Sequence, residues 1–180
     1  MTEEVRTRSM LERMIGAARL EVDVFEDVEH DTTATPQAAG VVAIVAVCAA
    51  IGASGMGTGG VISSLIAAFV GWLVWSWLTY FIGTRWLEGT ADWGEMLRTI
   101  GFAQAPGVLY VLGVVPMFGS LVKLAVWLWM LVAVIIAIRQ ALDFTTGKAI
   151  VTAGIGWMAY AAIGFVTALL FGIPLALLSG

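Results

Sequence analysis

The sequence predicts an all-α integral membrane protein, with five transmembrane helices preceded by a cytosolic amphipathic helix. Of the 180 residues, 60% are hydrophobic and only 12% are charged, and the mean hydropathy is +0.95. A soluble domain carries about a quarter charged residues. No charged side chain occurs between Thr32 and Thr84, or between Ala149 and Gly180. Because about 20 apolar residues suffice to cross a bilayer, these runs predict membrane spans.

The charged residues are concentrated at the N-terminus. Residues 1–31 hold nine acids and four arginines, whereas the remaining chain holds four acids and five bases. The net charge of −4 therefore comes wholly from this leader. A basic groove is absent from the sequence, which excludes nucleic acid as a partner.

Residues 1–36 are predicted to form a cytosolic amphipathic leader helix and a linker. Ser9 and Glu12 have the spacing of a capping box. Apolar residues then recur at helical spacing on one side of the helix, at Leu11, Met14, Ile15, Ala18, Val22 and Phe25. Acids crowd the second half of the leader. Docking on the protein's own cytosolic loops or on a partner fits that charge better than adsorption to an anionic leaflet.

Residues 37–180 are predicted to form the membrane domain, with spans at 37–53, 61–83, 96–115, 120–138 and 148–178. Pro36 suits the start of the first span, and Pro106 interrupts the third. Pro116 to Gly119 predicts a tight turn, and Pro174 a kink in the fifth span. In an alternative arrangement, spans three and four form a re-entrant hairpin.

Basic residues in the short loops predict the orientation. An N-terminus inside the cell places eight bases on the inner side and only Lys123 on the outer side. Five crossings then put the C-terminus outside. The expected location is the plasma membrane. A signal peptide is not expected, because the first apolar run begins near Gln37, behind a charged leader.

The sequence argues against an enzyme, a metal site or a cofactor. The expected spans contain no Asp and no Glu, and the single histidine, His30, lies in the acidic leader. His30 with Asp23, Glu26 and Asp27 resembles a metal-ligand set, but a solvated helix face explains these residues better. The lone Cys48 has no disulfide partner and is expected to be a buried apolar residue.

Polar and aromatic residues within the spans offer a second line of interpretation. Gln104 lies just before the break at Pro106. Main-chain carbonyls that lose their hydrogen-bond donors at this break could line a cavity, as they do in the broken helices of transporters. Lys123 lies close enough to the outer turn to reach water. A candidate apolar pocket comprises Trp72, Trp75, Trp127 and Trp129, although packing against glycine-rich neighbours is the commoner explanation of such residues.

Four short motifs resemble the Yip1-domain family of five-span membrane proteins. They occupy residues 78–83, 100–106, 115–119 and 146–149, in the family's order. The family's third-span motif resembles Gly-Tyr-Ser/Ala-x-x-Pro, and here Phe102 replaces the tyrosine. The leader from Arg13 to Glu29 is similar to prokaryotic members.

The resemblance implies topology more than activity. Eukaryotic members of the family act in vesicle trafficking and associate with prenylated Rab-type GTPases. The leader here lacks their long cytosolic domain, so the resemblance is taken to imply the fold and a tendency toward protein or lipid interaction, and not the Rab function.

The leading hypothesis is a non-enzymatic membrane interaction or scaffold protein, linked to membrane organisation or trafficking. Its partners are the lipid bilayer and a membrane or cytosolic protein, and its glycine-rich spans also suit homo-oligomers. The alternative is a small transporter or lipid-handling module built on the broken third span. The positions expected to serve interaction or form structural motifs are Glu26, Asp27, Glu29, Gly101, Phe102, Gln104, Pro106, Pro116, Gly119, Arg139, Asp143, Gly147 and Lys148. Among these, the cluster of Arg139, Asp143 and Lys148 is expected to meet the acidic half of the leader.

Overall fold

The computed structural model describes residues 8–53, 58–115, 117–167 and 169. Within these ranges the chain is helical and contains no strand. Five helical segments are long and apolar enough to cross a membrane, at Thr32–Gly52, Gly60–Trp86, Trp93–Val114, Gly119–Ala141 and Thr146–Val166. The chain is therefore an α-helical integral membrane protein, and the predicted number of five spans is confirmed.

The leader folds as two short helices, α1 (Met10–Ala18) and α2 (Val22–His30), where one helix was expected. The capping box of Ser9 and Glu12 starts α1 as predicted. The break follows from Leu20, whose φ of 64° is left-handed. The N–H of Leu20 donates to the carbonyl of Ala17 at 3.0 Å and that of Glu21 to the carbonyl of Gly16 at 3.0 Å. This pair of bonds is the Schellman motif, which ends a helix.

A short 3₁₀ turn, η1 (Thr32–Ala34), connects the leader to α3 (Thr35–Gly52). Pro36 stands in the first turn of α3, where its missing N–H costs nothing. The second span is α4 (Thr58–Trp86). The fourth is α6 (Gly119–Ala141) and the fifth is α7 (Thr146–Thr167). The predicted extension of span five to residue 178, its kink at Pro174, and the turn residue Pro116 lie outside the described residues.

The third span is divided into α5 (Trp93–Ala103) and a 3₁₀ helix, η2 (Ala105–Val114), with Gln104 between them. Pro106 causes this break, since it has no N–H to donate and its ring would clash, in a continuous α-helix, with the carbonyl four residues earlier. Ala105, Pro106 and Gly107 are buried at the break. A Cβ on Gly107 would lie 2.6 Å from Val45 and 3.2 Å from Met130, so neighbouring side chains pack closely against the interruption.

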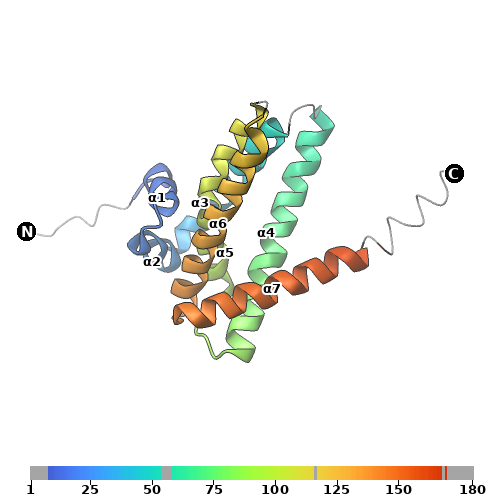
Figure 1. The fold of residues 1–180 in the computed structure, drawn as a ribbon. Helices are drawn as coiled ribbons and strands as arrows, with labels where there is room; N and C mark the ends of the chain where they lie inside the picture. The colour runs from blue at the N-terminus through green and yellow to red at the C-terminus, as the bar shows by residue number, and fades with distance from the viewer. Residues whose placement is uncertain (1–7, 54–57, 116, 168, 170–180) are drawn as a thin grey trace, which may run out of the picture.

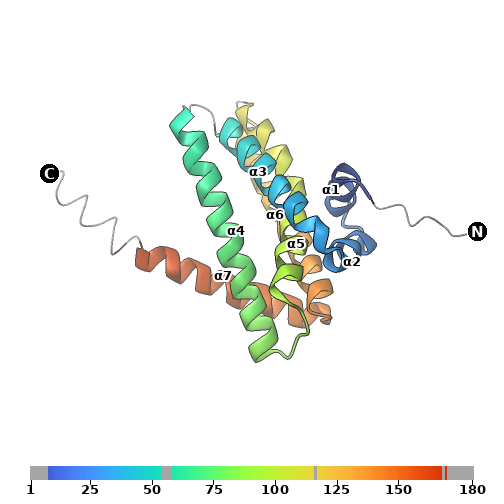
Figure 2. The ribbon, with the colours of Figure 1, turned by 180° about the vertical axis from the view of Figure 1, so that it is seen from behind.

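The helices form a bundle with two distinct ends. In both views α3, α4 and α6 run roughly alongside one another, whereas α7 crosses at a steep angle to α4 (Figures 1 and 2). We call the end formed by residues 84–92 and 142–145 the loop end; Thr90 there donates to Asp143 at 2.8 Å. The opposite end, formed by residues 113–115 and 117–123 with the last turn of α3, is the turn end.

The leader packs against the side of this bundle and shares its core. Val24, Phe25 and Val28 of α2 are almost fully buried, in one apolar cluster with Met96 and Ile138 of the membrane helices. Helices α1 and α2 lie beside α5 and α6 in both views (Figures 1 and 2). The apolar residues of α2 are thus part of the hydrophobic core of the bundle.

Candidate functional site: the docked leader and the turn-end groove

Arg13 of α1 fixes the leader internally. Its side chain is 1% exposed. It donates from Nε to Asp27 Oδ2 at 2.9 Å, from Nη2 to Asp31 Oδ2 at 2.6 Å, and from Nη1 to Gln37 Oε1 at 3.1 Å. The planar guanidinium matches this spread of acceptors, which a lysine would not. One side chain therefore joins α1, α2 and the first turn of α3.

Asp31 is held ionised by the same arrangement. Hydrogen bonds from Thr33 lower the pKa of the Asp31 carboxyl below its ordinary value, and the bond from Arg13 adds to this effect, while burial opposes it. Asp31 also stabilises η1, because its Oδ1 accepts from the Thr33 N–H at 2.9 Å. Asp27, expected to face the loops, instead pairs with Arg13.

Arg98 of α5 attaches the leader to the membrane helices. Its side chain is 4% exposed. Nε donates to the carbonyl oxygen of Val28 at 2.8 Å, and Nη2 donates to that of Glu29. The last carbonyls of a helix lack partners within the helix and carry the negative end of its dipole. A guanidinium placed there caps α2 and neutralises that end.

Glu29 is a buried acid at the junction between the leader and the bundle. The residue is 8% exposed, and burial raises its pKa to about 7. The charge of His30 opposes this shift, and the nearby acids Glu95, Asp143 and Glu26 make smaller contributions to it. The Glu29 side chain thus lies close to acids of both α5 and the α6–α7 loop.

The expected charged cluster meets the leader through a different residue. Arg139 donates from Nε to Gln140 Oε1 at 2.9 Å, and Gln140 donates from Nε2 to Glu26 Oε1 at 2.9 Å. Lys148 instead donates to the carbonyl of Leu87 at 2.9 Å. Within the described residues, Arg139, Asp143 and Lys148 form no ion pair with the acids of the leader.

The motif positions Gly101, Phe102 and Gly119 serve close packing. A Cβ on Gly101 would lie 2.8 Å from the Ala38 side chain, and one on Gly119 would lie 2.5 Å from the Gly113 carbonyl oxygen. Phe102 is fully buried. Gln104 caps α5, and its N–H donates to the carbonyl of Gly101 at 3.2 Å. Gly147 is different, because a Cβ there would meet nothing within 4 Å.

The four tryptophans lie in different environments. Trp72 is buried and donates from Nε1 to the carbonyl of Leu97 at 3.0 Å. Trp75 meets Tyr160 of α7 edge-on, with ring centroids 6.0 Å apart. Trp129 donates to the carbonyl of Ala18 at 2.8 Å, at the end of α1. The structure therefore separates the tryptophans that were expected to line one pocket.

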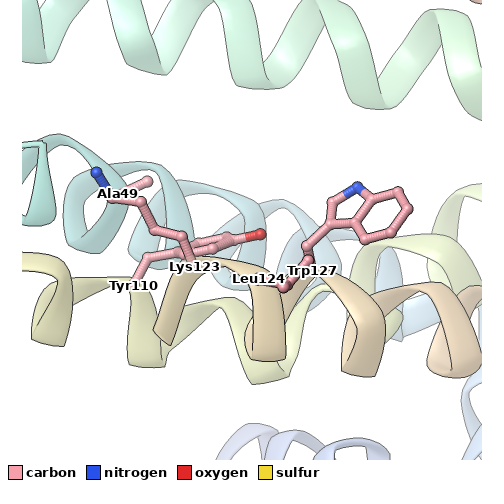
Figure 3. A pocket seen from close by; sticks show the side chains of 5 residues that line it. All are labelled: Ala49, Tyr110, Lys123, Leu124 and Trp127. Atoms are coloured by element: carbon pink, nitrogen blue, oxygen red, sulfur yellow. The ribbon is translucent and has the colours of Figure 1, made fainter. Parts of the chain in front are cut away.

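The remaining tryptophan, Trp127, lines a groove at the turn end. The groove has a volume of about 480 Å³ and is lined by Ala49, Tyr110, Lys123, Leu124 and Trp127. Figure 3 shows the Lys123 ammonium beside Ala49, with the Tyr110 hydroxyl directed toward Leu124 and Trp127. The groove is therefore mainly apolar, with one cationic and one hydroxyl group.

No group of three or more His, Cys, Asp or Glu suited to a metal ion occurs in the described part of the chain. His30 Nδ1 lies 2.9 Å from the Glu26 carbonyl oxygen.

The roles of Arg13, Arg98 and Gln140 were not predicted from the sequence. Arg98 carried a usable signal, since a charged side chain inside an apolar span is costly and is retained with a partner.

The comparisons with known proteins agree with this architecture. The sequence matches the family model described as the Yip1 domain over residues 25–169, which is well over half of the chain and includes all five spans. Neither the curated proteins nor the solved structures gave a significant match. The match begins within α2, so residues 25–30 of that helix lie inside the matched region. The chain belongs to the Yip1 domain family.

Proposed function

We propose that this chain is a non-enzymatic interaction or scaffold protein of the plasma membrane, and that its docked leader and loop end together form the face that binds a partner protein. The observation that carries the proposal is the double anchoring of the leader by Arg13 and Arg98. A segment held this firmly presents its outer side chains in a fixed arrangement, which lowers the entropic cost of binding.

The outer side of this face is polar and mostly acidic. Glu12, Asp23 and Glu26 are exposed on the leader, and Asp92 and Asp143 are exposed at the loop end. Leu11 is 64% exposed on α1 and supplies an apolar contact beside these acids. A polar rim around a few apolar residues is the usual composition of a protein interface. A partner with a basic patch fits this charge, since opposite potentials favour association.

The orientation supports the same role. The loop end carries Arg85, and Arg139 and Lys148 lie in the adjoining turns of α6 and α7, whereas the turn end carries Lys123. Bases favour the cytosolic side of a membrane. The leader and the loop end would then face the cytosol, where a soluble or membrane-bound partner can reach them.

Site-specific photo-crosslinking in native membranes tests this function. A photoreactive residue would replace Asp23 or Glu26 on the proposed face, and Leu121 or Trp157 as controls on exposed apolar positions of α6 and α7. We expect a defined protein adduct from the leader positions only, and we expect Glu26→Lys to weaken the adduct formed at position 23. The proposal would be contradicted if the leader positions crosslinked only to other copies of this chain, or if the control positions gave the same adduct in equal amount.

A further inference from the structure

Lys123 is a cation without a counter-charge. The described residues offer its ammonium neither an ion pair nor a hydrogen bond. The sequence explains why, because it contains no Asp or Glu between residues 32 and 84 or between residues 96 and 142. The acids at positions 88, 92, 95 and 143 belong to the loop-end part of the chain, at the other end of the bundle. The described acids therefore leave the Lys123 ammonium open to an anion from another molecule.

The stem of Lys123 is positioned by the backbone of η2. A Cβ on Gly113 would lie 3.0 Å from Lys123 Cε, so the absence of a side chain at Gly113 lets the lysine lie flat against η2. Lys123 follows the start of α6 by about one helical turn, or about 6 Å along the axis. An ammonium this close to the end of a span can extend along its stem to the polar surface of a bilayer.

The rest of the groove is apolar and runs toward the membrane interior. Leu124 and Trp127 continue along α6 from Lys123, and both are about half exposed on the outer surface of the bundle. The Tyr110 hydroxyl lies between the ammonium and the Trp127 ring (Figure 3). From the turn end inward, the groove thus presents a cation from α6, a hydroxyl from η2 and then apolar side chains of α6. A phospholipid has the matching order of phosphate, ester carbonyl and acyl chain.

We propose that the turn-end groove binds one anionic phospholipid, with Lys123 on its phosphate, Tyr110 donating to a glycerol ester carbonyl, and Leu124 and Trp127 against the acyl chain. An anionic headgroup is preferred because the ammonium of a zwitterionic lipid would compensate the phosphate that Lys123 binds. The groove is at the opposite end of the bundle from the loop end, and no leader residue lines it. Its test and the crosslinking test above can therefore fail independently.

Native mass spectrometry of the full chain, titrated with phosphatidylglycerol and separately with phosphatidylcholine, measures this binding. We expect tighter binding of phosphatidylglycerol. Lys123→Gln should weaken it about tenfold, which corresponds to about 1.4 kcal/mol, while Lys123→Arg should retain it. Arg85→Gln is the matched control, because it removes one exposed cation at the loop end and should change nothing. Tyr110→Phe, which deletes only the hydroxyl, should weaken binding by a smaller factor.

The source of the anion is tested in the same experiment. Excess inorganic phosphate should not displace the lipid, because it lacks the acyl chain that contacts Leu124 and Trp127. A photoreactive phosphatidylglycerol should label peptides of η2 and the first two turns of α6. Equal affinities for the two lipids, equal losses in Lys123→Gln and Arg85→Gln, or displacement by phosphate alone would overturn the proposal. Thermal unfolding of each variant verifies that the fold is intact.

Discussion

Arg98 of α5 donates to the main-chain carbonyl of Val28 at 2.8 Å, across 70 positions of sequence, and so joins the leader to the third span. The acceptor is a carbonyl at the helix end that has no partner within the helix, so the bond requires no particular side chain at position 28. A charged group inside an apolar segment is thereby satisfied by a leader helix that is itself only nine residues long. Helices this short are not stable alone in water, so α2 and Arg98 depend on each other.

Replacing Arg98 with alanine should release the leader. Two helix-end carbonyls would lose their donor in a buried setting, at a cost of about 1–3 kcal/mol each. We expect faster tryptic cleavage at Arg19, which lies between α1 and α2, in detergent-solubilised protein. Arg85→Ala, an exposed arginine of α4, is the control. If the two variants are cleaved at the same rate, Arg98 does not hold the leader.

Arg13→Met should destabilise the whole bundle. It leaves Asp27 and Asp31 without their partner, and losing one side of a buried ion pair costs about 3–5 kcal/mol. Because both aspartates retain some exposure to water, we expect the lower end of that range. Thermal unfolding followed by circular dichroism measures it. Arg13→Lys keeps the charge but loses the fork geometry, and should fall between wild type and Arg13→Met; equal unfolding temperatures for all three proteins would contradict this account.

Glu29 should make stability fall as the pH rises. Its folded-state pKa of about 7 lies above its ordinary value of 4.5. Between these values the folded chain holds a proton that the unfolded chain has released, so raising the pH favours unfolding. The loss begins near the ordinary pKa and is complete above about pH 7.

Glu29→Gln isolates this effect, because the amide keeps the shape of the acid but does not titrate. His30 changes stability in the same direction, because its pKa is raised chiefly by the Glu26 carbonyl and also by the charge of Glu29. The Glu26 part is common to both proteins, and the loss of the Glu29 part in the variant acts in the same direction as the loss of the Glu29 titration itself. The unfolding temperature of the wild type minus that of the variant should therefore decrease from low to neutral pH. A difference that stays constant with pH would rule out a role for Glu29.

Gly52→Ala should disrupt the turn end. A Cβ there would lie 1.8 Å from the Tyr110 carbonyl oxygen, so α3 and η2 would have to separate. Overpacking of this kind costs about 1–3 kcal/mol, which outweighs the higher helix propensity of alanine. Gly154→Ala in α7 is the control, since its Cβ would meet nothing within 4 Å. A similar unfolding temperature for both variants would show that the close approach is not required.

The proposed orientation predicts opposite labelling of the two ends. In a Cys48→Ala background, a cysteine replacing Phe118 at the turn end should react with an impermeant maleimide on intact cells. One replacing Thr90 at the loop end should react only after permeabilisation. Both native residues are exposed, so accessibility reports the side of the membrane. The reverse pattern would show that the topology is inverted, and labelling of neither position on intact cells would favour the re-entrant hairpin over full crossing of spans three and four.

The sequence by itself determined the number of spans, the capping box at Ser9 and the break at Pro106. These features depend on the apolar content of a local stretch or on the chemistry of one residue, both of which can be read directly from the chain. The motifs that resembled the Yip1 domain also lie within such stretches, and the family was identified from them.

Only the tertiary structure decided where the leader lies, what Arg13 and Arg98 bind, and how the tryptophans are distributed. Arg98 binds carbonyl groups, which every residue possesses, so no sequence pattern marks its partner. The charges of Arg139 and Lys148 suggested direct pairing with the leader, but the neutral Gln140 makes that contact. Periodicity predicts which face of a helix is apolar, whereas the neighbour that covers the face is selected by long-range packing of the whole chain.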